Sequence, residues 1–374
     1  MKRKFRYILA CLAIFLSIPM FQPILISADD TTKDNVPIDN STNNDESFDA
    51  TSFKNQVNTL LNEKKFSGTI LVMRNGKVLY ETSRGYSNYA KGKLNTENTS
   101  YEIDSIQKSF TAAMIMKQVE LGKLSLDDKL SKFYPNIPGS KKITIQQMLD
   151  MKSGLLMPTQ IGPSQVMSDD NILKNDITKL HFSSAYYNKW FYSPINYNLL
   201  SGILEKTTGK SYRYMFTKTY IDKLHLKHTI FAYDKSSHID KAAGYSNIDP
   251  LSAKADYRNA FRTNKYYTYD ELGTGQVYMS AEDLYKAEQY IVAGKMLTKK
   301  SQKQLHKSGS HSMYGGGFYN DKNNKFANGW GYGFQDVIHI SDNGKNAVVA
   351  LENYQRISVD IKPVVVQIYN MLNN

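Results

Sequence analysis

Two side chains, Ser105 and Lys108, are spaced so that together they could carry out nucleophilic chemistry. They lie three positions apart in a segment, residues 105–121, whose apolar residues recur at helical spacing until Gly122. Side chains three residues apart project from one face of a helix, so the amine can take the hydroxyl proton. Burial near the positive end of a helix lowers a lysine pKa from its usual value of about 10.4, which makes the amine a base near neutral pH. The Ser105 N–H, in the first helical turn, is free to donate to a developing oxyanion.

The sequence around this pair resembles the nucleophile helix of the serine β-lactamases and penicillin-binding proteins, and most closely that of class C β-lactamase-like hydrolases. The similarity begins with YEIDSIQKSFT at residues 101–111. Further similar segments follow in the family's order, at residues 121–128, 143–155 and 202–209. The resemblance extends from Phe53 to the C-terminus. It implies a two-step acyl transfer with Ser105 as the nucleophile, and it implies no cofactor and no metal ion.

The second motif of this family is Tyr-Ser-Asn, and the matching stretch here is Tyr192-Ser193-Pro194. By resemblance, the Tyr192 phenol relays the proton between Ser105 and the leaving group. Pro194 replaces the asparagine, whose amide helps to hold the acyl-amide side chain of the substrate in the family. Asn196 or Asn198 could substitute for it. The loss of the motif's amide argues against recognition of the usual stem peptide and of β-lactams.

The third motif, Lys-Thr-Gly or His-x-Gly on a strand edge in this family, is expected within residues 326–333. Neither lysine nor histidine occupies the expected place. Asn328 is the nearest polar candidate for a substrate contact, and the second oxyanion N–H is expected from Trp330 or Gly331. The alternative is a glycine-rich hairpin without a catalytic part. A missing cation argues against a substrate that ends in a carboxylate, such as a D-Ala-D-Ala peptide.

The pattern of elements predicts an α+β protein of the β-lactamase/transpeptidase type. We expect an antiparallel sheet formed from both chain ends, flanked by helices, with a helical subdomain inserted between them. Asn75-Gly76 predicts a two-residue hairpin turn between the first two strands. The expected strands lie at residues 69–73, 78–80, 314–318, 331–340 and 347–353, and the expected helices at 53–64, 105–121, 145–151, 197–207, 212–224, 281–293 and 359–372.

The chain divides into three parts by composition and charge. Residues 1–28 carry a basic start and an apolar run, which predicts a signal peptide or an N-terminal membrane anchor. Residues 29–50 contain seven acidic side chains and one lysine, which predicts an acidic disordered linker. Since the whole chain carries +12, with +4 and −6 in these two parts, the hydrolase domain at residues 51–374 carries +14. Such a domain is attracted to anionic polymers such as teichoic acids, although solvation by lysine explains the charge equally well.

Other kinds of chemistry find little support in the sequence. Cys11 is the only cysteine, which excludes an intramolecular disulfide and a cysteine-based metal cluster. The seven histidines lack the spacing of a zinc site, and the G-x-S-x-G motif of the α/β-hydrolases is absent. No zinc, helix-turn-helix or RNA-binding signature indicates a nucleic-acid partner.

These observations predict an extracytoplasmic serine hydrolase at the surface of a Gram-positive bacterium, either membrane-anchored or secreted. A kept nucleophile, lysine and tyrosine beside two altered binding motifs indicate that the chemistry is retained and the substrate has changed. We therefore place a D-alanyl esterase acting on teichoic acids ahead of a D-alanyl-D-alanine carboxypeptidase acting on peptidoglycan, with β-lactamase activity third. The alternative from another class is a catalytically idle protein that binds an envelope polymer.

Overall fold

The computed structural model describes residues 48–157, 165–247, 249, 252, 255–261, 266–307 and 312–372. The signal or anchor predicted for residues 1–28, and all but the last three residues of the predicted linker, lie outside this part. Residues Asp49–Asn374 form one compact unit. None of the helices within the described ranges is both long enough and apolar enough to cross a membrane.

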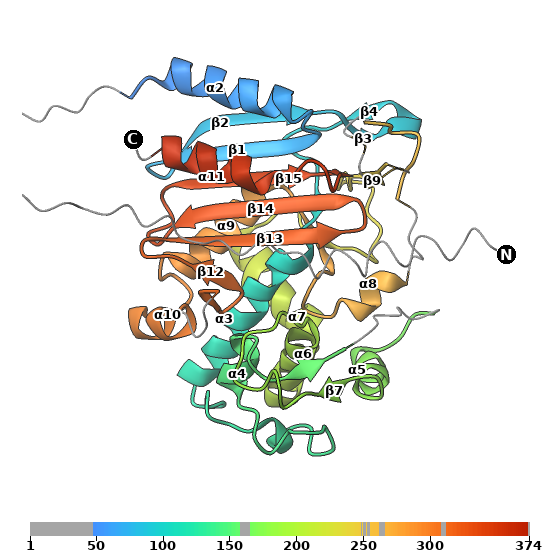
Figure 1. Cartoon of the computed structure of the whole chain (residues 1–374), viewed down its shortest axis with the longest axis vertical. Coiled ribbons are helices and arrows are strands. Elements are labelled where there is room, and N and C mark those ends of the chain that lie inside the picture. Colours follow the sequence, from blue (N-terminus) through green and yellow to red (C-terminus); the bar gives the residue numbers. More distant parts are fainter. Residues whose placement is uncertain are drawn as a thin grey trace, which may run out of the picture. The chain divides into compact units, whose positions relative to one another are not determined.

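A seven-stranded antiparallel sheet forms the centre of this unit, and both ends of the chain contribute to it (Figure 1). β1 is buried along nearly its whole length between β2 and β15, as expected for a central strand. Asn75 and Gly76, which connect β1 to β2, both have positive φ, as the predicted hairpin turn requires. In spatial order the strands are β11 (Tyr314–Gly315), β12 (Phe318–Asn320), β13 (Asn324–Gly331), β14 (Phe334–Ser341), β15 (Ala347–Glu352), β1 (Gly68–Arg74) and β2 (Lys77–Arg84).

Short strands outside this sheet tie the loops to one another. β10 pairs with β5 and β8, and the other short strands form two-stranded pairs: β3 with β4, β6 with β7, and β16 with β9. These strands are β3 (Tyr86–Asn88), β4 (Lys93–Leu94), β5 (Tyr101–Glu102), β6 (Leu155–Leu156), β7 (His181–Phe182), β8 (Ile230–Phe231), β9 (Tyr245–Ser246), β10 (Val277–Met279) and β16 (Tyr354–Gln355).

Helices cover the sheet and fill the segment between its two halves. The α-helices are α2 (Ala50–Glu63), α3 (Gln107–Glu120), α4 (Ile145–Leu149), α5 (Asp169–Ile177), α6 (Ile195–Thr208), α7 (Tyr212–Phe216), α8 (Tyr267–Asp270), α9 (Ala281–Val292), α10 (Lys299–Leu305) and α11 (Lys362–Met371). The tighter turns η2 (Tyr89–Lys91), η3 (Asp104–Ile106) and η4 (Leu130–Lys132) are 3₁₀-helical, and η5 (Thr217–Asp222) is π-helical.

The helices form two layers around the sheet and a separate helical region. α11 packs on β14, β15 and α2, whereas α9 packs on β1 and β15 and also contacts α3. Figure 1 shows α11 in front of the sheet and α9 behind it, with α4, α5, α6 and α7 below the sheet and around the lower part of α3. The predicted arrangement, one sheet from both chain ends with a helical subdomain inserted between them, is therefore confirmed.

α3 connects the sheet to the helical region and is buried on nearly every side. Its residues from Gln107 to Met116 are all buried, because α6, α9 and α10 pack around it. A helix that is buried all round cannot tilt or fray without opening the core. The segment that carries Ser105 and Lys108 is therefore held rigidly between the two halves of the unit.

Four predicted elements differ in detail from the structure. The helix expected from Ser105 begins at Gln107, after the 3₁₀ turn η3. The strand expected at residues 331–340 begins only at Phe334, because Tyr332 and Gly333 have positive φ and turn the chain between β13 and β14. The strand expected at 314–318 is divided between β11 and β12 by the turn at Gly316 and Gly317. The helix expected at 212–224 changes from α7 to the π-helical η5.

Candidate active site

The turn that precedes α3 brings Ser105 and Lys108 together. Ser105 lies in η3, and the Lys108 Nζ donates a hydrogen bond to its Oγ at 2.8 Å. Asp104, directly before the serine, has a φ of +43°, a left-handed conformation that costs about 1–3 kcal/mol for a residue other than glycine. Such strain persists only where the surrounding packing enforces it. The predicted pairing of hydroxyl and amine is present in the structure.

Burial makes the amine of Lys108 a suitable proton acceptor. Its side chain is 1% exposed, and this loss of solvent lowers its pKa from 10.5 to about 8. The negative charges of Glu271 and Asp104 oppose the shift, with the larger effect from Glu271. A substantial fraction of the amine is therefore neutral near physiological pH, as a general base requires.

Tyr192 lies against both members of this pair. The Lys108 Nζ is 5.3 Å from the centre of its ring, and the nearby Ser105 hydroxyl opposes the rise that burial causes in the pKa of the phenol. Tyr314 of β11 packs edge-on against the same ring, with 6.1 Å between the ring centres. Burial raises the pKa of the Tyr192 phenol above its usual value of 10, so this group keeps its proton at neutral pH and can give it to a leaving group.

The amide groups of Asn196 and Asn198, which could replace the missing amide of the second motif, already donate hydrogen bonds within the protein. Pro194 immediately precedes α6, and both asparagines lie in the first turns of this helix. The Asn196 Nδ2 donates to the Ser193 carbonyl at 2.9 Å, and the Asn198 Nδ2 donates to the Asp270 carbonyl at 2.9 Å. Both side chains are at most 1% exposed. Neither amide is thus available in the way the family's motif would need.

β13 passes very close to the turn that carries Ser105. A Cβ on Gly329 would lie 2.3 Å from the Ile103 carbonyl oxygen, and one on Gly331 would lie 3.1 Å from the Asp104 Oδ1. Beyond Phe326, β13 has no strand pairing with β12 in the described part of the chain, so this edge is open. Its backbone N–H groups near Trp330 and Gly331 remain the predicted second oxyanion donors.

The side chains of β13 place the candidates of the third motif differently. Residues 325, 327 and 329 form the buried face of the strand, whereas Asn328 and Trp330 alternate with them and are half-buried. Counting back from Gly329 as the motif's glycine, the place of the family's cation is taken by Ala327, which is 2% exposed. The amine of Lys325, on the same face, is paired with Asp342. The place of the family's cation therefore holds no charged side chain.

Several residues near the pair were not predicted from the sequence. Gly317, in the turn between β11 and β12, has a φ of +87°, and a Cβ there would lie 2.4 Å from the Ser109 nitrogen. It therefore lets this hairpin pack on the backbone of α3 next to Lys108. Glu271 follows α8 and places a carboxylate close to Asp104. Both Glu271 Oε2 and Asp104 Cα lie within 3.4 Å of the position that a Cβ on Gly275 would take.

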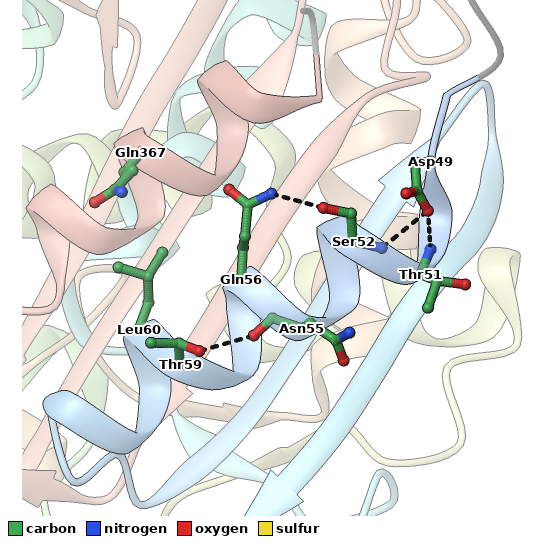
Figure 2. A pocket seen from close by; sticks show the side chains of 8 residues that line it. All are labelled: Asp49, Thr51, Ser52, Asn55, Gln56, Thr59, Leu60 and Gln367. Carbon is green, nitrogen blue, oxygen red and sulfur yellow. Dashed lines mark hydrogen bonds between the residues drawn. The ribbon is translucent and has the colours of Figure 1, made fainter.

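Two other features do not add to this site. A surface hollow of about 480 Å³ lies between α2 and Gln367 of α11 and is lined mainly by polar side chains such as Asn55 and Gln56, which Figure 2 shows. Its one carboxylate, Asp49, accepts hydrogen bonds from the Thr51 and Ser52 nitrogens and so caps α2. Over the described residues, no three histidine, cysteine, aspartate or glutamate side chains are grouped so that they could hold a metal ion.

Comparison with known proteins agrees with this geometry. The family model described as Beta-lactamase matches residues 53–359. A protein named putative penicillin-binding protein PbpX, from Bacillus subtilis, is 28% identical over 85% of this chain and 78% of its own length. A teichoic acid D-alanine hydrolase from Staphylococcus aureus is 30% identical over 77% of this chain and 70% of its own length. The crystal structure of FmtA from Staphylococcus aureus matches with a TM-score of 0.74 and 26% identity, covering 86% of this chain and 87% of that one. The chain therefore belongs to the Beta-lactamase family.

Proposed function

We propose that this protein is an extracytoplasmic serine hydrolase that removes D-alanine from the esters of teichoic acids. The observation that carries the proposal is the combination of a complete Ser105, Lys108 and Tyr192 group with an alanine, Ala327, where the family places a cation. The first part is suited to acyl transfer. The second disfavours a substrate that ends in a carboxylate, whereas a D-alanyl ester has none. The relative named teichoic acid D-alanine hydrolase supports the same reading.

The proposed reaction has two steps. The Ser105 oxygen attacks the ester carbonyl and passes its proton to Lys108, while backbone N–H groups of Ser105 and of Trp330 or Gly331 donate to the oxyanion. The C–O bond to the polymer then breaks, and Tyr192 relays a proton to the leaving alkoxide. Water next attacks the acyl-enzyme and gives its proton back through the same groups. D-alanine leaves, and the Ser105 hydroxyl is restored.

The charge of the chain supports a polymer substrate at the cell surface. Residues 51–374 carry a net +14, which favours encounter with the phosphates of a teichoic acid. Residues 1–28 would export the protein or anchor it in the membrane. Fractionation of a Gram-positive host that expresses the whole chain tests this placement, and recovery from the cytoplasm alone would contradict it.

The direct test is release of D-alanine from purified D-alanylated lipoteichoic acid. The protein from Asp29 onward is compared with its Ser105→Ala form, and Ser237→Ala, at an exposed serine, serves as the matched control. We expect release by the wild type and by Ser237→Ala, and none above background with Ser105→Ala. A D-Ala-D-Ala stem peptide is incubated in parallel.

The outcome separates the three candidate functions. Release from the peptide alone would replace the esterase with the D-alanyl-D-alanine carboxypeptidase. No release from either substrate, with binding of the polymer unaffected by Ser105→Ala, would indicate an idle envelope-binding protein.

A further inference from the structure

Glu271 is a carboxylate near Lys108 that the acyl-transfer chemistry described above does not use. It is half-buried in the turn between α8 and β10. Of the charged groups around Lys108, it has the largest effect on the amine, and it also acts on Tyr192. Its negative charge raises the pKa of Lys108, which works against a general base. A purely catalytic role for Glu271 therefore explains its position poorly.

The carboxylate is held in a fixed orientation by neutral groups. The Tyr332 hydroxyl donates to Oε1 at 3.1 Å, and the Thr274 hydroxyl donates to Oε2 at 2.8 Å. Tyr332 directly follows the last residue of β13 and has a φ of +49°. The strand edge near Ser105 and one of the two hydroxyls that hold Glu271 therefore belong to the same segment of the chain. Across the described residues, no lysine, arginine or histidine forms an ion pair with Glu271.

This arrangement leaves acceptor sites on the Glu271 carboxylate for a cationic ligand. A carboxylate offers about four lone-pair sites, and the two hydroxyl donors occupy one on each oxygen. An α-amino acyl ester carries its ammonium on the atom next to the carbonyl carbon. When Ser105 attacks that carbon, the ammonium must lie within a few ångströms of η3. The Glu271 Oε2 is on this side of the site, since it and the Asp104 Cα lie 3.2 and 3.4 Å from the position that a Cβ on Gly275 would take.

We propose that Glu271 binds the ammonium group of the D-alanyl ester and so selects α-amino acyl substrates. The inference rests on the esterase proposed above and names the group that recognises its substrate. Together with the alanine at position 327, it reverses the charge preference of the site. Other members of the family use a cationic side chain to bind a carboxylate of the substrate, whereas this protein would use a carboxylate side chain to bind an ammonium group of the substrate.

Two esters that differ only in the ammonium test this role. They are D-alanyl glycerol and propionyl glycerol, in which hydrogen replaces the amino group. Glu271→Gln preserves shape and removes the charge. We expect it to lower the ratio of kcat/KM for D-alanyl over propionyl ester by about tenfold to a hundredfold, the usual range for a hydrogen bond to a charged group. Glu282→Gln, at an exposed glutamate of α9 paired with Lys286, is the matched control and should leave the ratio unchanged.

A binding measurement separates this proposal from the esterase itself. In the Ser105→Ala background, calorimetry should find tighter binding of D-alanyl than of propionyl glycerol, and the preference should vanish with Glu271→Gln and return in part with Glu271→Asp. Equal binding of the two esters by Ser105→Ala would overturn the role of Glu271 even if the wild type hydrolyses both. An equal loss of kcat/KM on both esters in Glu271→Gln would also overturn it, because a group that only shifts the pKa of Lys108 affects both esters alike. Failure of the wild type to release D-alanine would instead refute the esterase.

Discussion

The pH dependence of the reaction should report the titration of Lys108. The side chain must be neutral to accept the Ser105 proton, so activity is lost as the pH falls through its pKa of about 8. An amine with the ordinary pKa of 10.5 would be about 0.03% neutral at pH 7, whereas one of pKa about 8 is about 9% neutral. Burial thus supplies about 300-fold more of the active base at pH 7. We expect kcat/KM to rise about tenfold per pH unit below pH 7 and to level off above pH 8.

The assay needs a substrate that does not titrate in the same range. An α-ammonium group loses its proton near pH 8 itself, so propionyl glycerol is preferable to D-alanyl glycerol. Rates measured with Ser105→Ala at each pH are subtracted, because esters hydrolyse spontaneously in base. A rate that still rises tenfold per unit up to pH 10 would refute the argument, since it would mean an unshifted amine. A rate independent of pH from 6 to 9 would refute it as well.

Three further predictions follow from contacts around this pair. Gly329→Ala would force a Cβ to within 2.3 Å of the Ile103 oxygen, so β13 must retreat by about 1 Å and kcat/KM should fall by about 100-fold, whereas Gly92→Ala, with open space around it, should leave activity intact. Tyr192→Phe should slow glycerol esters by about 100-fold or more but p-nitrophenyl esters much less, because the latter leaving group needs no proton. Burial raises the pKa of Glu288 from 4.5 to about 8, so the folded state retains a proton that the unfolded state releases, and stability falls as the pH rises. Between pH 6 and 8 the unfolding free energy, measured by urea titration, should therefore fall by about 2 kcal/mol less in Glu288→Gln than in the wild type.

Local spacing was sufficient to predict the parts of the site that lie on one element. Ser105 and Lys108 are one helical turn apart, so their hydrogen bond at 2.8 Å follows once η3 and α3 form. The N-terminus of α9 depends on equally short range, because the Ser280 hydroxyl accepts a hydrogen bond from the Asp283 nitrogen. In each case the interaction depends on backbone geometry within a few residues.

Interactions between distant elements were predicted less completely. The sequence indicated that β13 lies near the nucleophile, but not that Gly329 is required by the Ile103 carbonyl oxygen. The turn at Tyr332 was predicted as strand, since a tyrosine with positive φ has no sequence signal. Glu271 belongs to no motif, and its place beside Asp104 arises only when the turn before β10 folds against η3.

The opposing effects on Lys108 suggest how substrate and base are connected. In the free protein the charge of Glu271 raises the pKa of Lys108, while burial lowers it. An ammonium bound to Glu271 would place one positive charge beside that negative charge, and the resulting offset favours the neutral amine. For D-alanyl glycerol, the midpoint of the kcat profile, which reports the bound state, should therefore lie below that for propionyl glycerol. Glu271→Gln removes the negative charge itself, so with propionyl glycerol the midpoint of this variant should lie below that of the wild type. A midpoint that is the same for both esters in the wild type would show that the bound ammonium does not act on Lys108.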